Sequence, residues 1–184
     1  GKGYGTNSWH SRRGRNLLFS IILYPEFVAA NQQFLVSKSV SLGIYDYLSE
    51  YIADVSIKWP NDIYVEDRKI AGILIENDLI GTRMKSSIIG IGININQERF
   101  PEDLPNPISL RQMIEKKLPL KKELNHLCRC LDRRYRMLSG GKTDKINREY
   151  HEHLFRLNTM ARYRSDDKEF RAKIVGVSDY GQLV

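Results

Sequence analysis

Short apolar runs rich in β-branched residues recur through the first half of the chain and predict strands. The first run ends at Pro25 and is long and apolar enough to predict a buried strand. Two later runs flank the acidic stretch Glu66-Asp67-Arg68, which predicts a hairpin with a polar turn. The predicted strands cover residues 16–24, 55–59, 63–65, 69–76 and 85–96.

Apolar residues spaced three or four positions apart predict helices elsewhere. Ser109 with Gln112 three residues later has the spacing of a helix capping box. Gly140 and Gly141 are expected to end the helix predicted over 120–138, because glycine readily adopts the conformation that follows a helix. The predicted long helices cover residues 31–52, 120–138 and 146–157.

The pattern changes again after Asn158, where short strand-like segments at 160–163, 169–175 and 182–184 are separated by polar turns. We therefore predict a main domain over residues 1–157 and the start of a small β domain over 158–184. Most predicted strands are joined by hairpins, with one long helix inserted early. This order predicts an α+β fold with a mixed, largely antiparallel sheet and helices packed on it.

Composition narrows the class of protein. The chain has 184 residues, 41% of them hydrophobic and 28% charged, which is compatible with a packed core. No apolar stretch approaches the roughly 18–20 residues that a membrane helix needs, so no membrane segment is expected. The net charge of +7 suits nucleotide phosphates, nucleic acid or an acidic partner. The basic residues are widely spread, so most are expected on solvated faces and DNA binding is not expected.

Cys128 and Cys130 lie about 200° apart on a helix, so they point to different faces. The pair therefore predicts neither a disulfide framework nor a metal site. Reduced thiols of this kind are typical of a cytoplasmic protein.

Lys58-Trp59-Pro60-Asn61-Asp62 follows a predicted strand, which Pro60 ends. At the edge of a sheet, Asn61 and Asp62 are suited to hold a cation or a polar ligand, and Lys58 to contact a phosphate. When the segment is taken alone, a plain turn is the better explanation of Pro-Asn-Asp.

Lys69 borders an otherwise apolar strand that contains Ala71 and Gly72. A lysine in this position either extends to solvent or is held inward to meet an anion. The small residues beside it leave space for a ligand or another backbone.

Gly90 and Gly92 lie on one face of a predicted strand, and Asn94 continues that face by the strand period of two. The pattern fails as a dinucleotide fingerprint, because the third glycine and the following helix are absent. A flat ligand slot ending at Asn94 and a core strand with packing glycines both remain open. The glycine-rich segment from Gly1 to Trp9 adds a loop compatible with phosphate, with an aromatic ring suited to cover a heterocycle.

Together, and in this order, the four segments resemble the biotin protein ligase family. That family carries a Gly-Arg-Gly-Arg loop running on to Trp, a Lys-Trp-Pro-Asn-Asp motif, a Lys-(Leu/Ile)-Ala-Gly-Ile-Leu strand and a Gly-x-Gly-Ile-Asn strand. The matches span residues 1–96, and Lys-Trp-Pro-Asn-Asp with Lys69 downstream is their most specific part. The resemblance implies a catalytic domain like that of class II aminoacyl-tRNA synthetases, followed by a small SH3-like domain that is cut short here.

The resemblance also implies an activity: biotin is activated with ATP to biotinyl-5′-AMP and then transferred to a lysine of a biotin carboxyl carrier domain. Lys69 and Asp62 are the implied catalytic residues, and Asp62 is also the expected contact for Mg²⁺. A homodimer is left open. The implied biotin contacts are Gly1, Lys2, Gly3, Lys69, Gly72, Leu74, Gly90 and Gly92, and the implied ATP contacts are Trp9, Lys58, Asn61, Asp62 and Asn94.

The chain departs from the family pattern at Tyr4, which stands where a second loop arginine is common. That arginine helps to retain the adenylate, so retention is in question here. No helix-turn-helix precedes Gly1, so we expect a ligase form without a DNA-binding domain. One alternative is a lipoate ligase or octanoyl transferase, but the pattern of those enzymes lacks Lys-Trp-Pro-Asn-Asp. The other is a non-catalytic protein that binds a nucleotide or nucleic acid, and such a protein would not need both Asp62 and Lys69.

Overall fold

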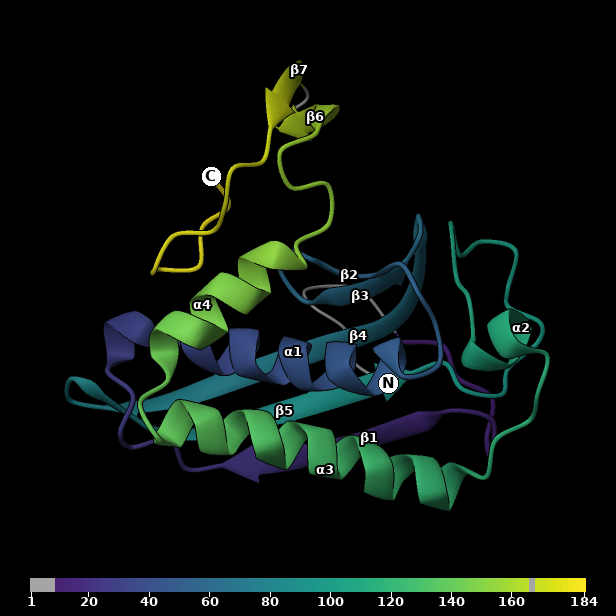
Figure 1. The fold of residues 1–184 in the computed structure, drawn as a ribbon, viewed down its shortest axis with the longest axis horizontal. Coiled ribbons are helices and arrows are strands. Elements are labelled where there is room, and N and C mark those ends of the chain that lie inside the picture. Colours follow the sequence, from purple (N-terminus) through teal and green to yellow (C-terminus); the bar gives the residue numbers. More distant parts are fainter. Residues whose placement is uncertain (1–8, 166–167) are drawn as a thin grey trace.

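The computed structural model describes residues 9–165 and 168–184. A five-stranded sheet carries helices on one face, and a separate two-stranded hairpin stands at one end (Figure 1). The elements in chain order are β1 (Leu17–Leu23), η1 (Ala30–Gln32), α1 (Phe34–Ser49), β2 (Val55–Lys58), β3 (Asp62–Val65), β4 (Arg68–Ile80), β5 (Arg83–Ile93), α2 (Leu110–Ile114), α3 (Leu120–Ser139), α4 (Thr143–Glu152), β6 (Met160–Ser165) and β7 (Lys168–Lys173).

The main sheet has the strand order β1-β5-β4-β3-β2, and every neighbouring pair is antiparallel. The hairpin predicted around the acidic turn is formed by β3 and β4, and Glu66 adopts a positive φ of 54° in that turn. The predicted α+β fold with a largely antiparallel sheet and helices packed on it is therefore confirmed.

The two faces of the sheet differ because side chains alternate along each strand. In β5, Ile89, Ile91 and Ile93 are fully buried against the helical layer. Gly90 and Gly92 alternate with them and face the opposite side. The helices therefore cover one face, and the other face is left for the cleft described below.

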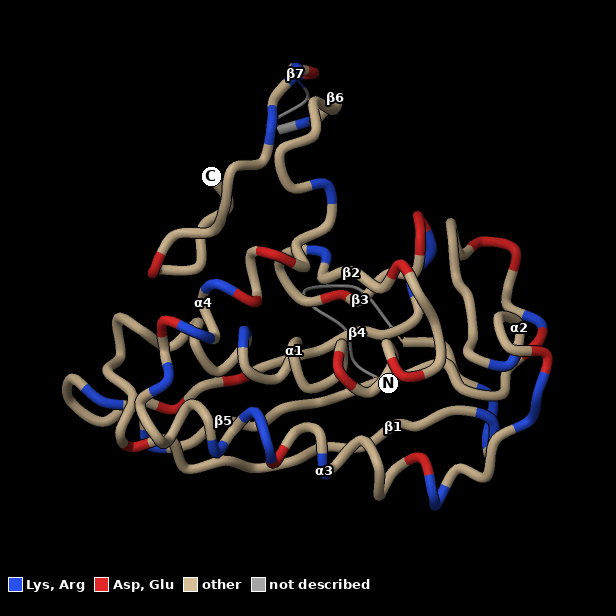
Figure 2. Tube along the Cα trace, in the orientation of Figure 1, with Lys and Arg blue, Asp and Glu red and all other residues tan. Residues whose placement is uncertain are grey.

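The helical layer consists of α1, which packs on the sheet, with α3 and α4 packed against it (Figure 1). Buried residues run along most of α1, whereas α3 is amphipathic and buries one stripe that includes Leu127 and Leu131. Lys and Arg residues occur along most of α3, with Asp and Glu residues between them (Figure 2). The predicted capping box is present, because Gln112 N donates to Ser109 Oγ and Ser109 N donates to Gln112 Oε1.

Three sequence expectations are wrong in detail. The strand predicted to be buried is β1, which lies at the sheet edge and leaves Leu18 and Ile22 more than half exposed. The helix expected to reach residue 157 ends at Glu152, because Arg156 and Asn158 adopt positive φ angles that a helix excludes. The expected strand at 182–184 is reduced to an isolated bridge between Val177 and Leu183.

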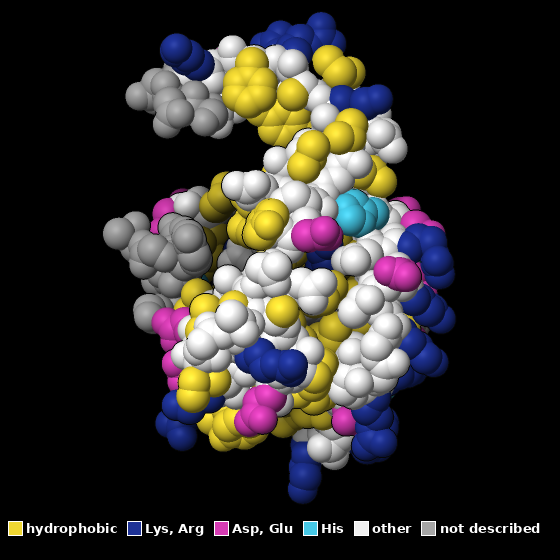
Figure 3. All heavy atoms as spheres, turned by 90° about the vertical axis from the view of Figure 1, so that its left-hand side faces the viewer, with side chains coloured by type: hydrophobic (Ala, Val, Ile, Leu, Met, Phe, Trp, Pro, Cys, Tyr) yellow, Lys and Arg dark blue, Asp and Glu magenta, His cyan; other side chains and the backbone are white. Residues whose placement is uncertain are grey.

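The C-terminal segment is tied to the main body at two points. The Nε1 of Trp59 donates to the carbonyl oxygen of Gly181 at 2.8 Å, and Val177 N donates to His151 Nε2 at 2.9 Å. The β6–β7 hairpin projects away from the main body, and basic side chains gather along its tip (Figure 3). Within residues 9–165 and 168–184, no helix combines the length and apolar character needed to cross a bilayer.

Candidate active site

A cleft of about 780 Å³ lies on the face of the sheet that the helices leave free. Its floor comes from β1, β4 and β5, and one wall comes from the turn that follows β2. The other wall is the proline-rich loop 100–107. Predicted site residues that line the cleft are Trp9, Asn61, Asp62, Lys69, Gly72, Leu74, Gly90, Gly92 and Asn94.

Lys69 and Asp62 form an ion pair inside this cleft, with Nζ 2.7 Å from Oδ1. Asp62 opens β3 and is paired in register with Gly72 of β4, which places its carboxylate beside the start of the glycine floor. The Lys69 and Asp62 side chains are 34% and 20% exposed. Of the two fates open to Lys69 in the sequence, the structure therefore selects the inward one.

The glycines in the floor leave room for the ring of Trp9. A Cβ atom on Gly92 would lie 2.5 Å from Trp9 Cε2, and one on Gly72 would lie 3.0 Å from Trp9 Cζ3. A Cβ on Gly90 would meet nothing closer than Leu74 at 3.8 Å. The slot predicted from the glycines is therefore present, with its Gly72–Gly92 end covered by Trp9 and its Gly90 end open.

Asn94 lies at the end of this slot and is almost fully buried. Its Nδ2 donates to the carbonyl oxygen of Ile108 at 3.0 Å, which fixes the amide orientation. The Oδ1 is buried and has no hydrogen-bond partner within the described part of the chain. A buried acceptor left in this state is costly, so Asn94 presents an acceptor suited to an N–H or O–H group of a ligand.

The Lys-Trp-Pro-Asn-Asp segment is divided between two pockets. Asn61 and Asp62 face the cleft, whereas Lys58 and Trp59 line a second pocket of about 490 Å³ beside β6. Lys58 Nζ donates to the Tyr64 hydroxyl at 2.9 Å, and Tyr64 borders both pockets. Lys58 therefore does not line the cleft itself, and it approaches the cleft only through Tyr64.

The loop 100–107 is the part of the site that sequence reasoning did not identify. It is held to Lys69 on both sides, since Lys69 N donates to Asn106 O and Ile108 N donates to Lys69 O. Phe100 and Leu104 line the cleft from this loop. Apolar side chains in a proline-rich surface loop were the available sign of a binding wall. Gly1, Lys2, Gly3 and Tyr4 lie outside the described residues, so their roles stay predictions.

This arrangement places a lysine ammonium group and a carboxylate beside the Gly72–Gly92 end of a slot with a flat glycine floor. The buried amide acceptor of Asn94 lies near the same end, because Asn94 N donates to the carbonyl oxygen of Ile70, the neighbour of Lys69. A cation in a partly dry cleft stabilises anionic groups brought together there. The glycine floor admits a flat heterocycle, and the amide is suited to an amino group. These are the parts needed to activate a carboxylate with a nucleotide.

Comparison with known proteins gives the family. The model of the biotin/lipoate A/B protein ligase family matches residues 1–94, just over half of the chain. The chain belongs to this family. The bifunctional ligase/repressor BirA of Bacillus subtilis (strain 168) is 31% identical over 192 residues, covering all of this chain and 58% of that protein. BirA of Escherichia coli (strain K12) is 37% identical over 111 residues, covering 58% of this chain and 33% of that protein.

Solved structures share the fold. The biotin protein ligase of Aquifex aeolicus in complex with biotin and ATP superimposes with a TM-score of 0.81 at 23% identity, covering 99% of this chain and 75% of that one. The biotin protein ligase of Leishmania major in complex with biotin gives 0.69 at 21% identity, covering 100% and 79%. The chain spans a little over half the length of the Bacillus relative, so the activity is argued separately below.

Proposed function

We propose that the protein is a biotin protein ligase, which activates biotin with ATP and transfers it to a lysine of a biotin carboxyl carrier domain. The observation that carries the proposal is the Lys69–Asp62 pair at 2.7 Å in a glycine-floored cleft, within a member of the biotin/lipoate ligase family. Residues 158–184 are proposed as the start of a small SH3-like domain, and residues 1–157 as the catalytic domain.

In the first step, an oxygen of the biotin carboxylate forms a bond to the α-phosphorus of ATP, and the bond to pyrophosphate breaks. Two anions meet in this step, and their repulsion raises the barrier. Lys69 is half-buried in the cleft and is proposed to bridge the biotin carboxylate and the α-phosphate. Its charge is then already in place when negative charge builds up on the phosphoryl oxygens.

In the second step, the amine of an acceptor lysine attacks the acyl carbon of biotinyl-5′-AMP. The amine forms an amide, AMP leaves with the bonding electrons of the C–O bond, and the amine loses a proton. Asp62 is proposed to face this region once Lys69 has turned to the substrates, which makes it a candidate to receive that proton. The loop 100–107 covers the cleft on one side and limits the access of water to the mixed anhydride.

Mg²⁺ fits the cleft when it arrives with ATP. Asp62 supplies one carboxylate, and no group of three or more metal-ligating side chains is found there among the described residues. One carboxylate together with substrate phosphates is a usual environment for Mg²⁺, which would neutralise phosphate charge. Asp62 and the nearby Asn61 are therefore proposed to hold Mg²⁺ with the triphosphate.

The remaining parts of the cleft suggest how the two substrates divide it. The open end near Gly90 and Leu74 is apolar and unobstructed, which suits the biotin ring. Asn94 Oδ1 suits the exocyclic amino group of adenine, and Trp9 offers a flat face nearby. Lys58 is proposed to act through the Tyr64 hydroxyl, and Gly1, Lys2 and Gly3 to cover biotinyl-5′-AMP.

The test is biotin-dependent exchange of labelled pyrophosphate into ATP, measured with the chain, Mg²⁺ and ATP. We expect exchange with biotin and formation of biotinyl-5′-AMP that is detectable by mass spectrometry. Lipoate is the matched second substrate, because the family model covers lipoate ligases as well. Exchange with lipoate and none with biotin would indicate a lipoate ligase instead. Exchange with neither substrate would overturn both assignments. Incorporation into a carrier domain then tests the transfer step.

A further inference from the structure

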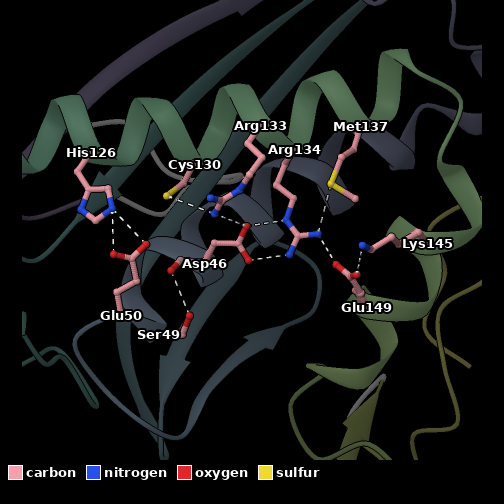
Figure 4. A network of polar contacts seen from close by, with 10 residues as sticks. All are labelled: Asp46, Ser49, Glu50, His126, Cys130, Arg133, Arg134, Met137, Lys145 and Glu149. Atoms are coloured by element: carbon pink, nitrogen blue, oxygen red, sulfur yellow. Dashed lines mark hydrogen bonds and ion pairs between the residues drawn. The ribbon is translucent and has the colours of Figure 1, made fainter.

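Three side chains with metal-binding atoms meet between α1 and α3, away from the cleft. Glu50 follows the last residue of α1, and His126 and Cys130 lie on α3. One donor atom from each lies within 4.8 Å of the other two. Figure 4 shows the imidazole facing the Glu50 carboxylate, with Cys130 on the adjacent turn of the helix. None of the three lines the candidate active site.

Helix geometry and packing bring these donors together. His126 and Cys130 are four residues apart, so they lie on the same face of α3. The close packing of α1 against α3 brings Glu50 to that face. Cys128 points elsewhere and is exposed, which is why the two cysteines together predicted no metal site. The site therefore combines one cysteine with a histidine placed by helix periodicity and a glutamate placed by tertiary packing.

The His126 ring is already oriented toward Glu50. Its Nε2 lies 3.2 Å from Glu50 Oε1 and 3.1 Å from Oε2. The ring packs edge-on against Tyr47, with the centroids 5.4 Å apart, and contacts Tyr51 on the same side. Glu123 accepts hydrogen bonds from both tyrosine hydroxyls, which holds those rings in place. Fixed surroundings of this kind keep an imidazole directed at a metal.

The donor set selects the class of ion. Imidazole nitrogen, thiolate sulfur and carboxylate oxygen are all ligands of Zn²⁺, whereas thiolate is a poor ligand for Mg²⁺ and Ca²⁺. Tetrahedral Zn²⁺ with bonds of about 2.0–2.3 Å places its ligands roughly 3.3–3.8 Å apart. The Glu50–His126 contacts of 3.1 and 3.2 Å are already close to that spacing, and all three donor atoms lie within 4.8 Å of one another, so small side-chain rotations are enough to reach it. The exposed side at Glu50 leaves room for water as a fourth ligand.

We propose that the chain binds one Zn²⁺ through Glu50, His126 and Cys130, with water completing the tetrahedron. The ion displaces the thiol proton of Cys130, and its bonds to His126 and Glu50 replace the contact between those two side chains. It ties the C-terminal end of α1 to the middle of α3, and its occupancy is independent of the reaction in the cleft.

The test uses the full chain after dialysis against a chelator, with Co²⁺ as a spectroscopic probe and Zn²⁺ as the competitor. We expect one equivalent of Co²⁺ to give a thiolate-to-cobalt charge-transfer band and the intense visible bands of tetrahedral cobalt. One equivalent of Zn²⁺ should remove both signals. Zn²⁺ should also raise the melting temperature, because it binds the folded form.

Variants identify the ligands. Cys130→Ser and His126→Ala should abolish the charge-transfer band and the Zn²⁺-induced rise in melting temperature. Glu50→Gln alters an exposed side chain at a helix end, so it keeps the fold and should weaken binding on its own. Cys128→Ser is the matched control, since it removes the neighbouring thiol and should leave the band unchanged. The proposal is overturned if the unmodified chain gives no band, if the band survives in Cys130→Ser, or if only Cys128→Ser removes it.

Discussion

Charged side chains pair in the cleft and also between the helices, and the two groups differ in what surrounds them. In the cleft, Lys69 meets Asp62 through one contact of 2.7 Å, and both side chains keep substantial exposure. Between the helices, Arg134 of α3 meets Asp46 of α1 through two contacts, of 2.7 Å and 2.6 Å. The same guanidinium also pairs with Glu149 of α4 (Figure 4).

The difference lies in how completely the partners satisfy each other. The planar guanidinium of Arg134 matches the Asp46 carboxylate in a fork and has only a tenth of its side chain exposed. Lys69 is a flexible point charge that faces an open volume, so it can exchange Asp62 for a ligand anion. The ion pairs of Arg134 therefore hold α1, α3 and α4 together. The Lys69–Asp62 pair, in contrast, is open to exchange with a ligand.

The largest effect on stability is expected from Arg134→Ala, which removes the cation shared by Asp46 and Glu149. Removing Arg134 leaves Asp46 and Glu149, both largely buried, with only the more exposed Arg133 and Lys145 as ion-pair partners. The change should therefore cost about 3 kcal/mol of the free energy of unfolding, near the lower end of the range for breaking a buried ion pair. Urea unfolding measures this loss. Any remaining folded protein should retain its exchange rate per folded molecule, since Arg134 does not line the cleft. A change of less than about 1 kcal/mol would remove the distinction between the two groups.

The opposite behaviour is expected of Lys69→Ala. Losing the cation that bridges the two anions should lower biotin-dependent pyrophosphate exchange by roughly 10²–10³-fold or more, with the melting temperature nearly unchanged. Lys85→Ala is the matched control, because Lys85 and Asp78 form a Lys–Asp pair at 3.1 Å across neighbouring strands, outside the cleft. That control should retain full exchange. Near-normal exchange by Lys69→Ala would refute the role given to Lys69.

Gly92→Ala tests whether the side chain packed on the floor of the cleft can move. The added methyl group would overlap Trp9 and should displace its ring, whereas Gly90→Ala makes only ordinary van der Waals contacts, the nearest with Leu74 at 3.8 Å. With the ring held in place, the overlap would cost about 1–3 kcal/mol of the free energy of unfolding. We expect Trp9 to move and so to relieve most of this cost. Tryptophan fluorescence should change in Gly92→Ala and stay unchanged in Gly90→Ala, with Trp59 as a constant background. Identical spectra for both variants would contradict the placement of Trp9.

The smallest expected effect concerns pH. Burial of Glu149 opposes its charged form, but hydrogen bonding and charge from Arg134, and then from Lys145, outweigh burial and lower the pKa of this carboxyl. A lowered pKa in the folded state adds stability above the unfolded value of about 4.3, and this stability is lost as the pH falls through the folded value. Glu149→Gln should therefore cost about 1–2 kcal/mol at neutral pH and progressively less below about pH 4. An equal cost at both pH values would contradict this assignment.

Local patterns predicted most of the elements because their causes are local. The capping box at Ser109, the acidic turn at Glu66 and the helix end at Gly140 depend on residues a few positions apart. The burial of β1 was predicted wrongly, because its position at the sheet edge depends on which strands pair. The end of α4 was also misplaced. Leu154 continues the apolar pattern but is buried through a bridge to Ile57 instead of through a helical turn.

For the site, residue type and spacing supplied the candidate groups Asp62, Lys69, Gly90, Gly92 and Asn94. They left a plain turn and a packing strand open as explanations, and only the family resemblance predicted roles for these residues. Tertiary structure alone decided how they are used. It directed Lys58 into a second pocket, laid Trp9 over Gly72 and Gly92, fastened the loop 100–107 to Lys69, and brought Glu50 to His126 and Cys130. The physical reason is that strand and helix periods fix which face a side chain takes, whereas its partner across a gap depends on packing between segments far apart in the chain.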